Sequence, residues 1–144
     1  MRRVIVLGGL GLFGRTAAEQ LRVLGVSIQT ASRRRGADLQ VDANDPASIR
    51  AAFKHGDIVV DAAGPFHLRS TALIEAAIEI GLDIIDINDD LIYAERVIAL
   101  KPRIDNTEIR VLSSASSVSA ISAAVVRHSG IAEPVRVAAF FRMS

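Results

Sequence analysis

The feature that most limits the fold of this chain is a glycine-rich turn near its N-terminus. Gly9, Gly11 and Gly14 have the spacing G-x-G-x-x-G. The turn follows an apolar run at residues 4–7, typical of a buried strand, and opens a helical pattern that continues to Leu24. A strand that passes through such a turn into a helix is the first unit of a parallel α/β sheet.

The turn also predicts a ligand. In folds that begin this way, the first glycine permits the tight turn, the second lets a pyrophosphate approach the backbone, and the third lets the helix pack on the strand. The helix N-terminus offers N–H groups and a positive dipole end to phosphates. We predict that Phe13 packs beneath the turn, and that the nucleotide contacts here are Gly9, Gly11, Leu12, Phe13 and Gly14. The alternative is a glycine-rich turn without a ligand.

The rest of the chain alternates apolar runs with helical patterns. The further predicted strands are 26–31, 39–42, 57–63, 82–87 and 109–112. The predicted helices are 14–24, 45–54, 68–80, 89–106 (bent near Pro102) and 118–128. This alternation predicts an α/β fold, a doubly wound parallel sheet of the Rossmann NAD(P)-binding type with strand order 3-2-1-4-5-6.

A basic loop follows the second predicted strand. NAD-binding chains of this fold carry an Asp or Glu there, about 20 residues beyond the glycine turn, which binds the ribose 2′-hydroxyl. This chain has Ser32, Arg33 and Arg34 instead. An acid would repel a 2′-phosphate, whereas a hydroxyl and guanidinium groups bind one. We therefore predict NADP as the cofactor, held by these three residues; the alternative is a solvated basic loop.

Two further segments are predicted to face the nucleotide. Asp42, at the end of the third strand, could accept a hydrogen bond from the adenine amino group or equally cap the turn before the next helix. After the fourth strand, small residues would let a dinucleotide lie against the backbone, while Phe66 could pack near the nicotinamide or cover the core. The residues predicted to contact the nucleotide in that loop are Ala62, Ala63, Gly64 and Pro65.

Polar residues also follow the fifth and sixth strands. For Asp89 and Asp90 we favour a role as N-cap of the next helix over contact with a substrate. The serine-rich segment 113–117 could line the nicotinamide site or cap the helix that follows. None of these patterns identifies a catalytic residue.

Composition argues against several other kinds of site. The chain has no cysteine, and its three histidines are scattered, so we expect no metal. A net charge of +1 gives no general attraction to nucleic acid or membranes. No apolar run approaches the roughly 20 residues of a membrane span, and no targeting segment is visible, so we expect a cytoplasmic protein.

Several segments together resemble a known family. Residues 8–15, 62–66, 83–87 and 111–118 look like the NADP-binding domain of the saccharopine dehydrogenase family, and the likeness runs over about residues 2–130. The resemblance implies an NAD(P)-dependent oxidoreductase with a substrate domain after this one. Members of the family act on amino-acid-type C–N bonds, and many others are reductase-like proteins without a characterised reaction. Members often carry Gly and Pro after the sixth strand, where this chain has residues 116–119, so no particular substrate is implied.

We therefore expect residues 1–130 to form the cofactor domain of an NADP-dependent oxidoreductase, inactive by itself. Residues 131–144 would begin a missing C-terminal substrate or dimerisation domain, and an apolar strand at 135–141 with an open edge would favour a homodimer. A short-chain reductase is disfavoured because Tyr93 has Val97, not lysine, four residues later. The alternative is a non-catalytic NADP-sensing module that binds a partner protein.

Overall fold

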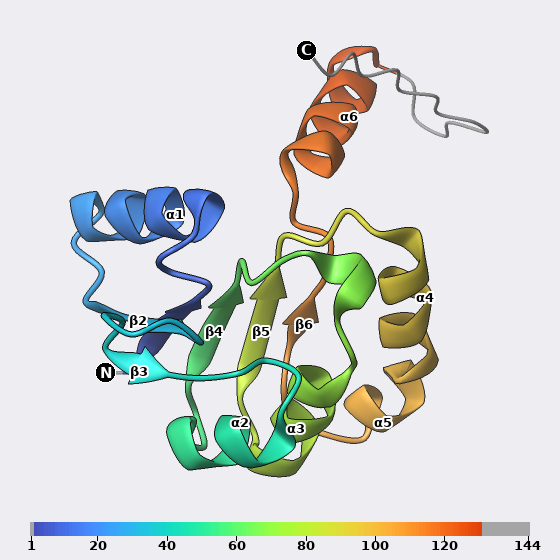
Figure 1. The fold of residues 1–144 in the computed structure, drawn as a ribbon. Helices are drawn as coiled ribbons and strands as arrows, with labels where there is room; N and C mark the ends of the chain where they lie inside the picture. The colour runs from blue at the N-terminus through green and yellow to red at the C-terminus, as the bar shows by residue number, and fades with distance from the viewer. Residues whose placement is uncertain (1, 131–144) are drawn as a thin grey trace.

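A computed structural model of the chain describes residues 2–130 and shows a six-stranded parallel sheet with helices packed against it (Figure 1). The strand order is β3-β2-β1-β4-β5-β6, and every neighbouring pair is parallel. The predicted fold class and strand order are confirmed. The predicted second domain, the apolar strand at 135–141 and the homodimer that it would form lie outside the described residues.

The elements are short and closely connected. The strands are β1 (Val4–Leu7), β2 (Ile28–Ser32), β3 (Leu39–Gln40), β4 (Ile58–Asp61), β5 (Asp83–Asp86) and β6 (Val111–Leu112). The helices are α1 (Leu12–Val23), α2 (Pro46–Ala52), the 3₁₀ turn η1 (Phe66–Leu68), α3 (Ala72–Ile80), α4 (Leu91–Ala99), α5 (Lys101–Asp105) and α6 (Ser117–His128).

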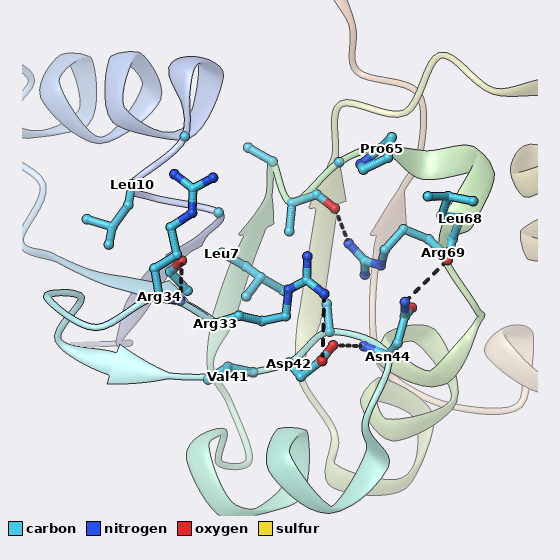
Figure 2. Close-up of a pocket in the computed structure, with 17 residues that line it drawn as sticks. Leu7, Leu10, Arg33, Arg34, Val41, Asp42, Asn44, Pro65, Leu68 and Arg69 are labelled. Carbon is cyan, nitrogen blue, oxygen red and sulfur yellow. Dashed lines mark hydrogen bonds and ion pairs between the residues drawn. The ribbon is translucent and has the colours of Figure 1, made fainter.

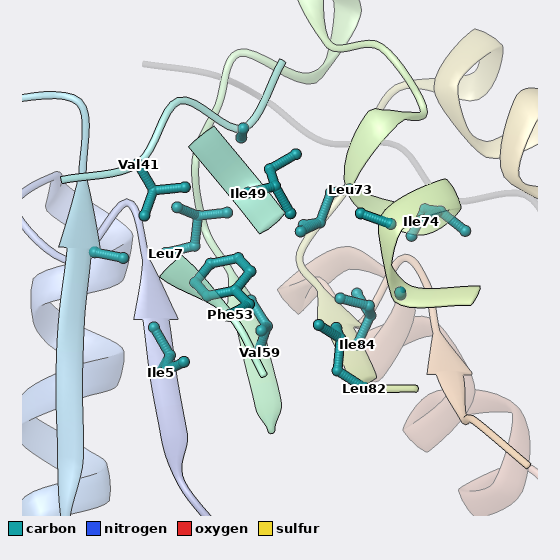
Figure 3. Close-up of a cluster of buried hydrophobic side chains, with 14 of the residues drawn as sticks. Ile5, Leu7, Val41, Ile49, Phe53, Val59, Leu73, Ile74, Leu82 and Ile84 are labelled. Atoms are coloured by element: carbon teal, nitrogen blue, oxygen red, sulfur yellow. The ribbon is translucent and has the colours of Figure 1, made fainter. Parts of the chain in front are cut away.

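The main hydrophobic core lies on one face of the sheet, beneath α2 and α3 (Figure 3). Alternate residues of a strand point to the same face, so Ile5 and Leu7 of β1 enter this core together. They pack in one cluster with Ile49 of α2 and Leu73 of α3, all at most 1% exposed. Burial of these apolar side chains, rather than helix propensity, holds the short helices in place.

Helix α1 covers the opposite face of β1 and β2. Val6 points away from Ile5 and Leu7 and is buried outside the main cluster, as is Ala18 of α1. The row that continues from Val6 across the sheet, Val60, Ile85 and Leu112, becomes increasingly open toward β6, where Leu112 is 58% exposed. Coverage of this face therefore decreases with distance from α1 among the described residues.

The helix predicted at 68–80 begins later than expected. Phe66–Leu68 form the separate turn η1, Arg69 points into the protein, and α3 begins only at Ala72. Asn44 holds the intervening segment, because its side-chain oxygen accepts hydrogen bonds from both the backbone N–H and the hydroxyl of Ser70. The helical spacing of apolar residues is continuous over 68–80, but these tertiary contacts favour an irregular turn at its start.

The predicted helix 89–106 is two helices, α4 and α5, with the break at Leu100 and Pro102 in the first turn of α5. Proline is tolerated there because the first N–H groups of a helix have no partner within it. Asp45 caps α2 by accepting a hydrogen bond from the Ala47 N–H, as predicted.

Candidate functional site

The glycine-rich turn joins β1 to α1 by a very close passage of the backbone over itself. Gly8 has a φ of +80°, and its N–H donates to the carbonyl of Ala31 at the end of β2 (2.8 Å). A Cβ on Gly14 would collide with the carbonyl oxygen of Gly8, so Gly14 allows α1 to start against the strand, as predicted. Gly11 is the N-cap of α1 and has no side chain to cap it, which leaves the first turn's N–H groups for a ligand.

A pocket of about 260 Å³ opens beside this turn, at the carboxyl ends of the strands (Figure 2). Figure 2 shows the basic loop on one side, residues Pro65, Leu68 and Arg69 on the other, and Asp42 and Asn44 below. The predicted site residues that line it are Gly11, Ser32, Arg33, Arg34, Asp42, Ala62, Ala63, Gly64 and Pro65. Segments from four separate parts of the chain thus meet where a doubly wound sheet binds its ligands.

Four predicted contacts do not line this pocket: Gly9, Leu12, Phe13 and Gly14. Gly9 and Gly14 instead serve the turn itself, because a Cβ on either would come within 3.0 Å of neighbouring atoms. The prediction that Phe13 packs beneath the turn is wrong: the ring is 68% exposed. Phe13 lies one residue after Leu12, the first residue of α1, while the buried face of that helix is carried by Gly14 and Ala18.

The basic loop presents its guanidinium groups to solvent. The hydroxyl of Ser32 accepts a hydrogen bond from the backbone N–H of Arg34 (3.1 Å), which bends the chain at the end of β2. Within the part of the chain that the structure describes, Arg33 has one ion pair, a 4.0 Å contact with Asp42 in which both side chains are well exposed. Such a pair contributes little to stability, so Arg33 is free to turn toward an anionic ligand.

Asp42 performs the capping role that the sequence left open. Its carboxylate accepts a hydrogen bond from the Asn44 N–H (2.9 Å), and the Asp42 N–H donates to the hydroxyl of Ser48. The same side chain lines the pocket, so contact with an adenine ring remains a prediction.

A buried ion pair lies directly beneath the loop that follows β4. Asp61 is fully buried and Arg69 is 5% exposed, and both carboxylate oxygens accept hydrogen bonds from the guanidinium group, at 3.1 and 2.9 Å. Burial raises the pKa of Asp61, against the opposing effect of Arg69 and of the Ala63 N–H. Burial acts to lower the pKa of Arg69, but the charge and hydrogen bonds of Asp61 outweigh it and raise that pKa. Arg69 therefore stays charged inside the protein.

The sequence reasoning missed Arg69 altogether. The helical pattern from residue 68 placed it on an ordinary first turn, and a single arginine in an arginine-rich chain carries little information. The available signal was Asp61, a carboxylate at the end of an apolar strand, because a buried acid needs a cationic partner nearby. The other lining residues that were not predicted are Leu7, Gly8, Leu10, Val41, Ala43, Asn44 and Leu68.

A second buried carboxylate, Asp86 at the end of β5, organises the loops beyond the pocket. It accepts hydrogen bonds from the Asn88 N–H, the Ser113 hydroxyl and the Ser114 N–H. Asp90 caps α4 by accepting from the Tyr93 N–H (2.8 Å), which confirms the capping interpretation. These polar residues therefore hold the segments after β5 and β6 together.

Two aromatic side chains, Phe66 and Tyr93, pack beneath the Asp61–Arg69 pair. Phe66 is 6% exposed and contacts Tyr93 with ring centroids 5.2 Å apart, so it covers the core, which was one of the two predicted alternatives. The Arg69 guanidinium lies 5.6 Å from the centre of the Phe66 ring. Burial raises the pKa of Tyr93, and the charge of Asp61 adds to this, so the phenol stays protonated.

Two other kinds of feature are absent from the described residues. Within residues 2–130, no three His, Asp or Glu side chains gather as a metal site would require. No helix in that part of the chain is long and apolar enough to cross a membrane.

Comparisons with solved structures support the fold. The protein lin1944 from Listeria innocua is 17% identical with a TM-score of 0.59, over 78% of this chain and 76% of that one. UDP-glucose 4-epimerase from Thermus thermophilus, solved with NAD, is 14% identical with a TM-score of 0.55, over 77% of this chain. Vestitone reductase from alfalfa is 17% identical with a TM-score of 0.52, over 78% of this chain. This chain spans 53% of the epimerase and 56% of the reductase.

The comparison with family models is more specific. The model of the saccharopine dehydrogenase NADP binding domain matches residues 4–112, from the first strand to the last. No match was found among curated proteins.

Proposed function

Because this chain belongs to the family of saccharopine dehydrogenase NADP-binding domains, we propose that it is the cofactor domain of an oxidoreductase and prefers NADP to NAD. The observation that carries this proposal is the pocket in which Ser32, Arg33 and Arg34 face the glycine turn and the loop after β4. A bound NADP would supply the hydride chemistry, while the protein binds and orients it.

The residues present fit such a cofactor. The close passage of Gly8 and Gly14 leaves no side chain between the backbone and a pyrophosphate at the start of α1. Leu7 and Val41 provide apolar surface in the same pocket, where an adenine ring could pack. The Arg33 side chain is 69% exposed, so its guanidinium group can bind a 2′-phosphate without breaking a buried contact.

We further propose that proton transfer to a substrate depends on residues outside this pocket. Among residues 2–130, its lining includes no histidine, tyrosine or lysine, and the one carboxylate there, Asp42, caps a turn. A substrate domain contributed by another part of the protein would provide these groups, and the domain by itself would bind nucleotide without turnover.

Calorimetric titration with NADPH and NADH tests the preference. Replacing Arg33 and Arg34 by alanine removes charge-assisted hydrogen bonds worth about 1.5–3 kcal/mol each, so NADPH binding should weaken by about tenfold or more while NADH binding changes little. Arg35→Ala is the matched control, because Arg35 is adjacent in sequence but does not line the pocket. Equal binding of the two nucleotides by the unmodified protein would refute the 2′-phosphate argument.

A further inference from the structure

A buried ion pair, Asp61 with Arg69, lies under the loop that follows β4 and has no role in the function proposed above. Asp61 is at the end of β4, and Arg69 comes from the segment between η1 and α3. A buried ion pair is weak evidence for stability, since the cost of removing two charges from water offsets their attraction. The Asp61–Arg69 pair lies beside the pocket, which points to a role in shaping the binding site rather than in stability.

The pair holds both polar groups of one residue, Ala63. The Ala63 N–H donates to a carboxylate oxygen of Asp61 at 3.0 Å, and the Ala63 carbonyl accepts from the Arg69 guanidinium at 2.6 Å. The loop could therefore move only by breaking hydrogen bonds to buried charges, which are among the stronger ones in proteins.

The loop that this ion pair holds lies in close contact with the glycine turn. A Cβ on Gly8 would lie 2.6 Å from the carbonyl oxygen of Ala62 and 2.8 Å from the Cα of Ala63. The Ala62 N–H also donates to the carbonyl of Leu7 at 2.8 Å, so the two walls of the pocket are joined at this point. Any displacement of Ala63 would change the width of the space between them.

We propose that Asp61 and Arg69 form a clamp that positions the residue 62–65 loop against the glycine turn and so pre-forms the dinucleotide pocket. This inference rests on the proposed function and deepens it. Arg69 acts as a positioning residue: its two terminal nitrogens are engaged by Asp61 and the Ala63 carbonyl. Pre-organisation of a loop increases affinity because binding then does not have to order it.

The clamp predicts a pattern of affinities that differs from that of the basic loop. Residues 62–65 would contact the part of the molecule that NADPH and NADH share, so loss of the clamp weakens both by the same factor. Loss of Arg33 or Arg34 changes the ratio between them. The ratio therefore distinguishes a clamp from a 2′-phosphate contact.

The test uses the double variant Asp61→Asn with Arg69→Met. Removing both charges avoids leaving one of them buried without a partner, which would unfold many proteins. Arg69→Lys serves as the conservative variant, since an ammonium group can still reach one carboxylate or carbonyl oxygen. The matched control is Arg3→Met with Asp57→Asn, a partly buried pair near the opposite ends of β1 and β4, in which Asp57 is buried and the Arg3 side chain is 28% exposed.

We expect the Asp61/Arg69 double variant to bind NADPH and NADH about tenfold or more weakly, by equal factors, and the lysine variant to recover part of the loss. Amide hydrogen exchange at Ala63 should accelerate in the double variant. The Arg3/Asp57 control should lose thermal stability but keep both affinities, which separates positioning from a general loss of structure.

Unchanged affinities in the Asp61/Arg69 variant, or an equal loss in the control, would overturn the inference while leaving the cofactor function intact. If the unmodified protein bound neither nucleotide, the proposed function would fail and the inference with it. The two failures are therefore distinguishable from the behaviour of the unmodified protein.

Discussion

At the scale of single residues, this protein is marked by polar groups buried at the carboxyl edge of the sheet. Asp61, Arg69 and Asp86 are all at most 5% exposed, and Tyr93 is 1% exposed beside them. Among the described residues, three buried side-chain atoms have no hydrogen-bond partner: Arg69 Nε, Asp86 Oδ2 and Tyr93 Oη. Each unpaired buried group costs free energy, so a few side chains here are not optimised for stability.

Tyr93 gives the simplest test of that cost. Its ring packs on Phe66, but its hydroxyl is buried without a partner. Tyr93→Phe keeps the ring and removes the hydroxyl, so the free energy of unfolding should stay the same or rise by about 1 kcal/mol. Chemical denaturation measures this free energy. Phe66→Leu is the control, because it loses the ring packing and should be destabilised. A loss of more than about 1 kcal/mol in Tyr93→Phe would mean that the hydroxyl has a partner.

Gly14 tests the close start of α1. A methyl group there would collide with the Gly8 carbonyl, and the backbone around it cannot shift without moving β1. Gly14→Ala should lower the free energy of unfolding by about 2 kcal/mol and weaken nucleotide binding. Gly64→Ala is the control for stability, because the nearest atom to its Cβ is 3.9 Å away. Equal stability of the two variants would contradict the steric argument.

At the scale of elements, short helices depend on their ends. α4 has nine residues, and an isolated helix of that length is unstable in water. It is held by burial of Tyr93 and Val97 and by its N-cap, Asp90. The same residue joins α4 to the preceding loop, since its N–H donates to the side-chain oxygen of Asn88 (2.8 Å).

The neighbouring aspartates allow a sharp test of this cap. Asp90→Ala removes the acceptor for the Tyr93 N–H and should lower the free energy of unfolding by about 1 kcal/mol. Asp89→Ala changes the same charge one residue earlier, where no cap is made, and should have an effect within about 0.5 kcal/mol. Thermal unfolding of both variants measures these changes in stability, and a larger effect at Asp89 would show that the cap is assigned to the wrong residue.

At the scale of the whole molecule, two ion pairs of one aspartate join the β6 edge of the sheet to its central strands. Asp83 begins β5 and binds Arg2, next to β1, and Arg110, next to β6. Burial acts to raise the pKa of Asp83, but hydrogen bonds from the Arg110 backbone and from the two guanidinium groups outweigh it, so the pKa lies below its ordinary value. The carboxylate therefore stabilises the fold only while it is ionised.

This arrangement predicts a pH dependence with a definite sign. Because the pKa of Asp83 is lower in the folded than in the unfolded state, its contribution is complete above the ordinary value of 3.8 and is lost as the pH falls below it. Asp83→Asn should lower the melting temperature at neutral pH, and the difference from the unmodified protein should shrink toward about pH 2. Asp105→Asn, in an exposed pair with Lys101, should change little at any pH. A constant difference for Asp83→Asn would contradict the ionic explanation.

The sequence by itself determined the order of the sheet, the glycine turn and the cap of α2, and it favoured an aspartate cap for α4 without choosing between Asp89 and Asp90. The turn and the caps are local, since turn chemistry and capping act over a few neighbouring residues, whereas the strand order follows from the connection rules for alternating strands and helices. The basic loop and the residue 62–65 segment were placed at the same edge because all parallel strands end there. None of these inferences required knowledge of which distant side chains touch one another.

Only the tertiary structure decided which side chains are buried at that edge. Arg69 turns inward because Asp61, eight residues earlier, is enclosed by the sheet and needs its charge. Asn44 fixes the segment before α3 from another part of the chain, through its bonds to Ser70. Phe13 stays exposed because α1 packs through smaller residues. Each outcome depends on long-range packing, which the spacing of residues along a single chain does not encode.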